Sequence, residues 1–164
     1  MAQTSAMAGW HDFFVAQAGV AGALIGLLFV AVSINLTRIL QLPQLPTRAA
    51  DTLAQFFAVL VVAAMALVPG QSDRALGCEV AGAAACAWAF ELRGVVKTFA
   101  QDRGTPYVKS RLVLNLVPPL PYLVAGVGLA VGYAGAPIWF LPGTLACFAA
   151  GVAGAWVLLI EIQR

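Results

Sequence analysis

The amino-acid sequence predicts an all-α integral membrane protein, a single transmembrane domain of about five helices. Of its 164 residues, 62% are hydrophobic and 10% are charged, whereas soluble domains carry about 25% charged residues. The mean hydropathy is +0.90. The apolar residues form long uniform runs, and only helices or closed barrels satisfy their own backbone hydrogen bonds in lipid. Barrel strands alternate apolar and polar residues, so these runs predict helices.

The first predicted span, residues 13–36, contains no charged residue. About 24 helical residues extend roughly 36 Å, which exceeds the ~30 Å hydrocarbon core of a bilayer. Asp12 is expected to cap this helix. Gly22 and Gly26 lie four residues apart on one face, and small residues let helices approach closely in lipid. We therefore expect this face to contact another helix, either of this chain or of another copy.

The second predicted span covers residues 50–68, after a loop over 38–48, and ends at a Pro-Gly pair that stops the helix. The third predicted span, residues 75–97, carries Glu79 and Glu91 with eleven uncharged residues between them. Eleven helical residues reach only about 16 Å. If this segment crosses the bilayer, one or both glutamates therefore lie within the hydrocarbon or at its edge.

The fourth predicted span, residues 112–133, is interrupted. Asn115 is followed by three prolines, Pro118, Pro119 and Pro121. Proline has no backbone N–H and clashes with the preceding turn, so we expect the helix to break or kink here. Interrupted membrane helices often line binding sites.

Glycines mark expected packing faces in the fourth span and in the fifth, which covers residues 138–162. Gly128 and Gly132 belong to a glycine run that lacks the strand and loop context of a nucleotide-binding motif. Gly151 belongs to a series of small residues spaced four apart. Close helix packing is the expected role of all three.

Basic residues give the expected orientation. With five spans, one side of the membrane holds only Arg74, while the other holds eight basic residues: Arg38, Arg48, Arg93, Lys97, Arg103, Lys109, Arg111 and Arg164. Short cytoplasmic loops are enriched in Lys and Arg. We therefore predict the N-terminus outside and the C-terminus in the cytoplasm. No Lys or Arg precedes the first span, so no cleavable signal sequence is expected.

The sequence contains no hydrolase elbow, P-loop, HExxH motif or paired metal ligands. An enzymatic activity, a cofactor, a metal site and a nucleic-acid partner are therefore not expected. The candidate intramembrane polar site consists of Glu79, Glu91 and Asn115. These groups either serve the interfaces and the structure, or form a proton or ion pathway, or contact a partner protein.

Two stretches of the first span carry a resemblance: residues 10–16 read WHDFFVA, and residues 26–35 read GLLFVAVSIN. Both resemble a family of small bacterial multi-pass inner-membrane proteins of uncharacterised activity, some of whose members are labelled "modulator of FtsH protease". The resemblance implies a location in the bacterial cytoplasmic (inner) membrane. It carries over no functional residue.

Two functions follow as hypotheses. The first is an accessory, regulatory or assembly protein that acts through helix packing, with itself or with a membrane-protein partner. The second is a small oligomeric ion or proton channel or transporter, which would use Glu79, Glu91 and the proline-broken fourth helix. The sequence names no substrate, ion or partner.

Overall fold

The computed structural model describes residues 6–7, 9–41, 45–101 and 114–163. Over these residues the chain is helical and contains no strand, which confirms the predicted all-α class. The elements are α1 (His11–Ile34), α2 (Leu36–Gln41), α3 (Leu45–Ala66), α4 (Asp73–Gln101), α6 (Leu120–Ala130), η1 (Ala136–Trp139) and α7 (Phe140–Gln163).

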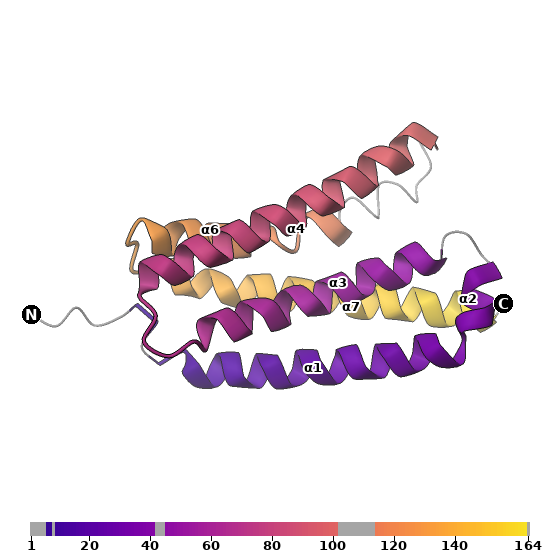
Figure 1. Cartoon of the computed structure of the whole chain (residues 1–164), viewed down its shortest axis with the longest axis horizontal. Helices are drawn as coiled ribbons and strands as arrows, with labels where there is room; N and C mark the ends of the chain where they lie inside the picture. The colour runs from indigo at the N-terminus through magenta and orange to yellow at the C-terminus, as the bar shows by residue number, and fades with distance from the viewer. Residues whose placement is uncertain (1–5, 8, 42–44, 102–113, 164) are drawn as a thin grey trace, which may run out of the picture.

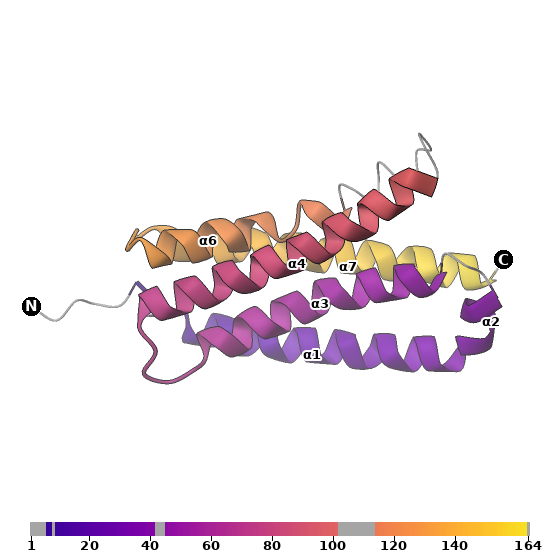
Figure 2. The same ribbon diagram turned by 45° about the horizontal axis from the view of Figure 1, so that its top comes forward.

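The long helices lie side by side along one axis, and α1 begins at the opposite end of the bundle from the end of α7 (Figure 1). Helices α1, α4 and α7 run in one direction, and α3 and α6 run in the other. Helix α3 packs against both α1 and α7, while α4 packs chiefly against α6. Toward its C-terminal end α4 diverges from α3 (Figures 1 and 2).

Within the described residues, four helices are long and apolar enough to cross a membrane: His11–Ile34, Leu45–Ala66, Asp73–Arg93 and Ala136–Ile160. The expected fourth span differs, because its apolar helical stretch, Leu114–Ala130, is shorter and is interrupted. Many large hydrophobic side chains point outward; Leu27 is 68% and Ile34 is 78% exposed. Such an outer surface is stable in lipid and costly in water.

The segment between the first two spans is more helical than the sequence predicts. Helix α2 occupies residues 36–41, and α3 begins at Leu45 instead of about residue 50. Pro46 lies in the first turn of α3, where proline is tolerated because that N–H has no intrahelical acceptor. The expectation that Asp12 caps α1 is wrong. The helix begins at His11, its N-cap is Trp10 without a side-chain bond, and the Asp12 carboxylate lies 3.1 Å from His11 Nδ1.

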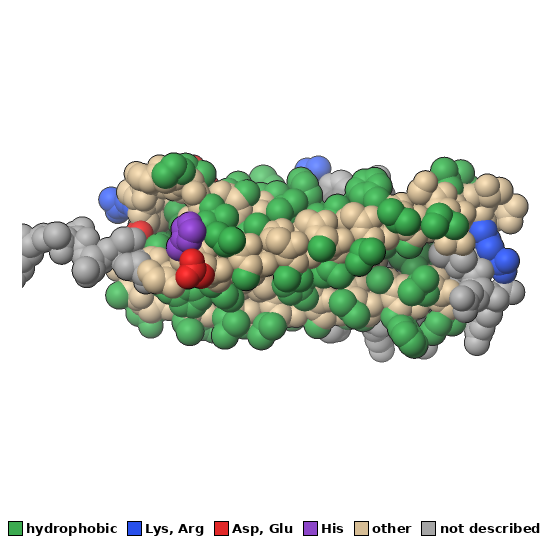
Figure 3. Space-filling model, turned by 90° about the horizontal axis from the view of Figure 1, so that it is seen from below, with side chains coloured by type: hydrophobic (Ala, Val, Ile, Leu, Met, Phe, Trp, Pro, Cys, Tyr) green, Lys and Arg blue, Asp and Glu red, His purple; other side chains and the backbone are tan. Residues whose placement is uncertain are grey.

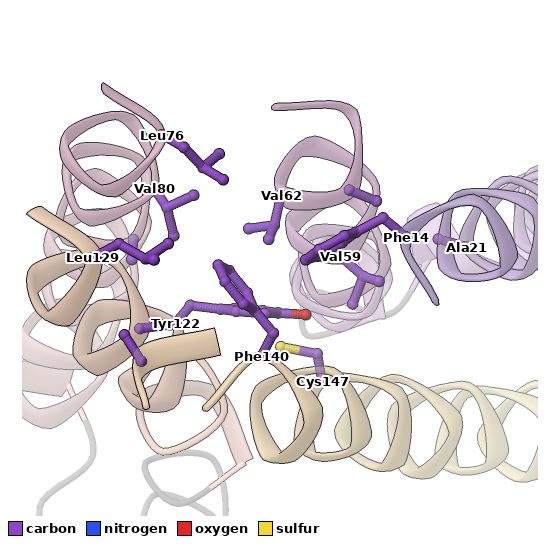
Figure 4. Packing of buried hydrophobic residues seen from close by; sticks show 14 residues of the cluster. Phe14, Ala21, Val59, Val62, Leu76, Val80, Tyr122, Leu129, Phe140 and Cys147 are labelled. Carbon is purple, nitrogen blue, oxygen red and sulfur yellow. The ribbon is translucent and has the colours of Figure 1, made fainter. Parts of the chain in front are cut away.

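The main hydrophobic core lies toward the end of the bundle where α1, α4 and α7 begin (Figure 4). The rings of Phe14 and Phe140 meet edge to face with their centroids 5.2 Å apart. The Tyr122 hydroxyl forms a buried 2.8 Å hydrogen bond with Thr144 Oγ1. Aromatic rings from α1, α6 and α7 thus hold the bundle together at this end.

Glycines allow two of the helix pairs to touch backbone to backbone or backbone to side chain. A Cβ atom on Gly126 would lie 2.5 Å from the Ala81 nitrogen, and one on Gly77 would meet the Ala130 nitrogen. These glycines therefore set the close approach of α4 and α6. On α7, Gly151 lies against the Phe56 ring and Gly154 against the Thr52 hydroxyl, so α7 approaches α3 in the same way.

Gly132 corrects one of the expected packing positions. It lies just beyond the end of α6 with φ of 81°, and a Cβ atom added to it would meet no described atom within 4 Å. Its N–H donates to the Leu129 carbonyl at 3.0 Å, and the Tyr133 N–H donates to the Gly128 carbonyl at 2.8 Å. This is the Schellman arrangement of a helix end, which requires a left-handed residue. Gly132 therefore serves to end α6, and among the described residues it packs against no other helix.

Candidate functional site

Four polar residues form one stripe along the first half of α3. Asp51 and Thr52 follow Arg48 by three and four residues, and Gln55 follows them by four and three, so the four residues share a helix face. The Thr52 hydroxyl donates to the Arg48 carbonyl at 2.9 Å. We call these four residues the polar stripe. Thr52 and Gln55 are buried, and Arg48 and Asp51 are half-buried.

A broken helix faces this stripe. Residues 114–116 are helical, residues 117–119 form a turn, and α6 starts at Leu120. Because Pro118 and Pro119 have no N–H, the carbonyls of Leu114 and Asn115 cannot receive the usual bond from four residues ahead. The Leu120 N–H instead reaches the Val117 carbonyl at 3.2 Å.

Side chains from two helices hold residues 114–119, which we call the broken segment. From α4, the Trp88 indole N–H donates to the Leu116 carbonyl at 3.1 Å. Toward α3, Asn115 Nδ2 donates to Asp51 Oδ2, also at 3.1 Å. Asn115 is buried, with 6% of its surface exposed. The broken segment is thus pinned between α4 and α3 by hydrogen bonds to its backbone and to its side chain.

A cavity of about 130 Å³ lies between the polar stripe, the broken segment and α7. It is lined by the polar stripe and by Leu114, Asn115, Ala150, Ala153, Gly154 and Val157. Two larger cavities, of about 210 and 200 Å³, are lined entirely by hydrophobic side chains of α1, α2, α3 and α7. We call the cavity that the polar stripe lines the polar cavity.

The structure does not gather the three polar residues singled out in the sequence into one site. Glu79 is exposed, near the start of α4, and accepts a 2.6 Å hydrogen bond from Gln71 Nε2 in the preceding turn. Glu91 is buried, with 8% exposed, one turn beyond Trp88. Asn115 lines the polar cavity and binds Asp51.

The rest of the polar cavity is not predicted by the sequence. Because the sequence indicates a helix start near residue 50, Arg48 falls at the end of the predicted loop. Asp51 falls in the first turn of the predicted second span. The signal that could have found them is the spacing of the polar stripe, since four polar residues on one face of an apolar helix predict a polar neighbour or a cavity.

The second candidate surface is the outer face of α1, formed by Gly19, Gly22, Ala23 and Gly26. All four residues are exposed, and a Cβ on any of the three glycines would meet no atom within 4 Å. The side of the bundle along which α1 runs carries mostly hydrophobic and uncharged atoms over its long middle part, with one basic group at the upper edge of the view (Figure 3). Gly22 and Gly26 therefore contact no other described helix of this chain.

Some other helical glycines, unlike those on the outer face of α1, lie in close contact with a neighbouring element. A Cβ on Gly128 would lie 2.7 Å from Ala136 Cβ in η1, and Gly151 lies against Phe56. Gly82 on α4 is open, as the α1 glycines are. Open glycines on a lipid-facing helix leave room for a second helix to approach.

Within the described residues, no group of three His, Cys, Asp or Glu side chains is arranged to hold a metal ion. Cys78 and Cys86 are exposed on α4, and Cys147 is buried in the core. Comparisons of the chain with protein-family models, with curated proteins and with solved structures find no match.

Proposed function

We propose that this protein is a multi-pass accessory or assembly protein of a bacterial inner membrane, which acts by docking the outer face of α1 against a transmembrane helix. The carrying observation is that Gly19, Gly22 and Gly26 are open, while Gly77, Gly126 and Gly151 lie in tight contacts inside the bundle. In lipid, helices associate through close packing of small residues. The docked helix belongs to a second copy or to another membrane protein.

The proposed topology has five crossings, with the N-terminus outside and the C-terminus in the cytoplasm. This topology is supported by the position of α6, whose C-terminal end lies beside the start of α4. There the Arg74 Nε of α4 donates to the Ala130 carbonyl of α6 at 3.1 Å. The chain that leaves α4 at the opposite end has thus returned before α7 starts. Arg38 and Arg48 lie toward the end of the bundle where α7 ends, as the positive-inside rule requires of a cytoplasmic side.

The test is the mass and composition of the particle extracted from native membranes in mild detergent. We expect a complex, either of identical chains or with a stoichiometric partner. Replacing Gly22 and Gly26 together by Leu is expected to reduce the particle to the single chain, because the new side chains hold the docked helix away.

The chain supplies a matched control in Gly82→Leu. Gly82 is also exposed, helical and open, but it lies on α4. Since neither site contacts the rest of the bundle, neither change disturbs the fold of the single chain. A wild-type protein that extracts as a single chain, or a complex unchanged by the Gly22 and Gly26 changes, would refute the proposal.

A second candidate function is a proton or ion pathway, and the burial of Glu91 on α4, one turn beyond the Trp88 that binds the broken segment, favours it. Buried carboxylates in membrane helices often belong to proton relays. Five crossings enclose little space, so such a pathway would form between copies. Reconstituted protein should then carry a flux that Glu91→Gln abolishes and Glu79→Gln leaves intact, because Glu79 is exposed near the helix start. Liposomes that pass no protons or ions under any applied gradient would exclude this function.

A further inference from the structure

The polar cavity is distinct from the surface on which the proposed function depends, because none of its lining residues belongs to α1. Its volume of about 130 Å³ corresponds to roughly four water molecules at about 30 Å³ each. It is therefore large enough for a small organic molecule.

Gln55 supplies an independent sign of a ligand. Its side chain is 5% exposed and lines the cavity, and no hydrogen bond joins its amide to another residue of the described part of the chain. Its amide is not among the fully buried unpaired groups of the described residues, so its polar atoms remain accessible in the cavity that Gln55 lines. A molecule in the cavity that both donates and accepts hydrogen bonds could pair with this amide.

The backbone beside Gln55 adds acceptors. The carbonyls of Leu114 and Asn115 lose their helical donors to Pro118 and Pro119, and both residues line the cavity. Asn115 and Thr52 line the same cavity, and their side chains carry an amide oxygen and a hydroxyl that can accept hydrogen bonds. The wall thus offers one primary amide without partners, a second amide, a hydroxyl and main-chain oxygens.

The charge of the wall selects against ions. Among the described residues that line the cavity, only Arg48 and Asp51 are charged, and their formal charges cancel. An ion transferred into an apolar setting without a counter-charge pays a large desolvation cost. An uncharged polar molecule pays much less, and two amides are good partners for it.

We infer that the polar cavity binds a small uncharged molecule that carries hydrogen-bond donors and acceptors together, such as a primary amide. Gln55 and Asn115 recognise its polar end, and Ala150, Ala153 and Val157 contact its apolar part. The ligand fills the space between α3, α7 and the broken segment.

The experiment titrates purified full-length protein in lipid nanodiscs with three probes of nearly equal shape. Acetamide is neutral, acetate is an anion and acetamidinium is a cation. Binding is followed by saturation-transfer NMR, which detects weak complexes. We expect acetamide to bind and the two ions to bind at least about tenfold more weakly, since tenfold corresponds to 1.4 kcal/mol.

Variants locate the site. Gln55→Leu removes the amide, and Ala153→Leu fills the cavity while leaving every polar group in place; each is expected to weaken acetamide binding about tenfold. Gln17→Leu is the matched control, because Gln17 is also 5% exposed but lies on α1, away from the cavity. It should bind acetamide as the wild type does. Size-exclusion profiles establish that each variant is folded.

Three outcomes overturn the inference. In the first, none of the probes binds, and the cavity holds water alone. In the second, acetate or acetamidinium binds more tightly than acetamide. In the third, acetamide binds equally well to folded Gln55→Leu and Ala153→Leu proteins. Because the probe series needs no variant, the inference stays testable even if one substitution prevents folding.

Discussion

Gln17 is a buried polar side chain near the start of α1. It lies between Phe14 and Ala21 on the inward face of α1, and neither its nitrogen nor its oxygen has a hydrogen-bond partner among the described residues. Tyr122 and Thr144 illustrate the opposite case, because their hydroxyls satisfy each other at 2.8 Å. The two cases predict opposite effects of removing polar atoms.

Gln17→Leu is expected to raise the free energy of unfolding by about 1–2 kcal/mol, because it removes a buried amide that has no partner among the described residues. Thr144→Val should lower the free energy of unfolding by about 1 kcal/mol, because it leaves the Tyr122 hydroxyl alone. Thermal unfolding in detergent measures both changes. A loss of stability in Gln17→Leu would show that the amide has a partner.

Trp88 illustrates how a single side chain stabilises a broken helix. In a regular helix the Leu120 N–H would donate to the Leu116 carbonyl, but here it donates to the Val117 carbonyl. The Leu116 carbonyl accepts a hydrogen bond from the Trp88 indole N–H in its place. An unmet carbonyl in lipid is costly, and the indole N–H meets it.

Trp88→Phe keeps an aromatic ring but removes the donor. We expect a loss of about 1–2 kcal/mol in unfolding free energy and faster hydrogen exchange in the first turns of α6. Trp139→Phe is the control, since Trp139 is 41% exposed and forms no hydrogen bond with a described side chain. Equal effects of the two substitutions would contradict the assigned role of Trp88.

At the scale of elements, the pairing of α4 with α6 depends on glycine. A Cβ at Gly77 would meet the Ala130 nitrogen and would lie 2.7 Å from the Gly126 carbonyl oxygen, both of them backbone atoms. Backbone of a packed helix moves only together with the whole helix. Gly82, about one and a half turns further along α4, faces open space.

Gly77→Ala should therefore destabilise the protein by about 1–3 kcal/mol through overpacking. Gly82→Ala should stabilise it by up to about 1 kcal/mol, because alanine favours helices and meets no neighbour. Unfolding of the two variants in the same detergent compares them directly. Similar stabilities would mean that α4 and α6 do not pack as described.

The sequence predicts the helices well, because long apolar runs and Pro-Gly stops act locally. It predicts the break near Pro118 for the same reason. It does not predict the start of α3 at Leu45, since Pro46 fits both a loop and a first helical turn. It also does not distinguish Gln17 from Gln55, because both are single glutamines in apolar helices and their surroundings depend on which helices meet.

At the scale of the whole molecule, the number of crossings decides the sides on which the termini lie. Four helices meet the length for a span, and the fifth apolar stretch, Leu114–Ala130, is shorter. Its 17 residues would reach about 25 Å if fully helical. Hydrophobic mismatch of this size is tolerated when the bilayer thins or neighbouring residues complete the span.

We expect reporter fusions to place the C-terminus in the cytoplasm and the turn at Gly135 outside. A reporter active only in the cytoplasm should work at Arg164, and one active only outside should work at Gly135. If the broken segment and α6 do not cross, the Gly135 fusion would report the cytoplasm. That result would leave four crossings, with both termini outside.

The sequence by itself determined the helical class, the apolar exterior, the asymmetry of basic residues and the position of the helix break. Each of these depends on composition or on neighbours within one helical turn. The tertiary structure alone decided which glycines are closed and which are open, and it brought Asn115 to Asp51 across the bundle. The physical reason is that a side chain's partners come from other helices, and the apolar pattern of a single helix does not specify which helices pack together.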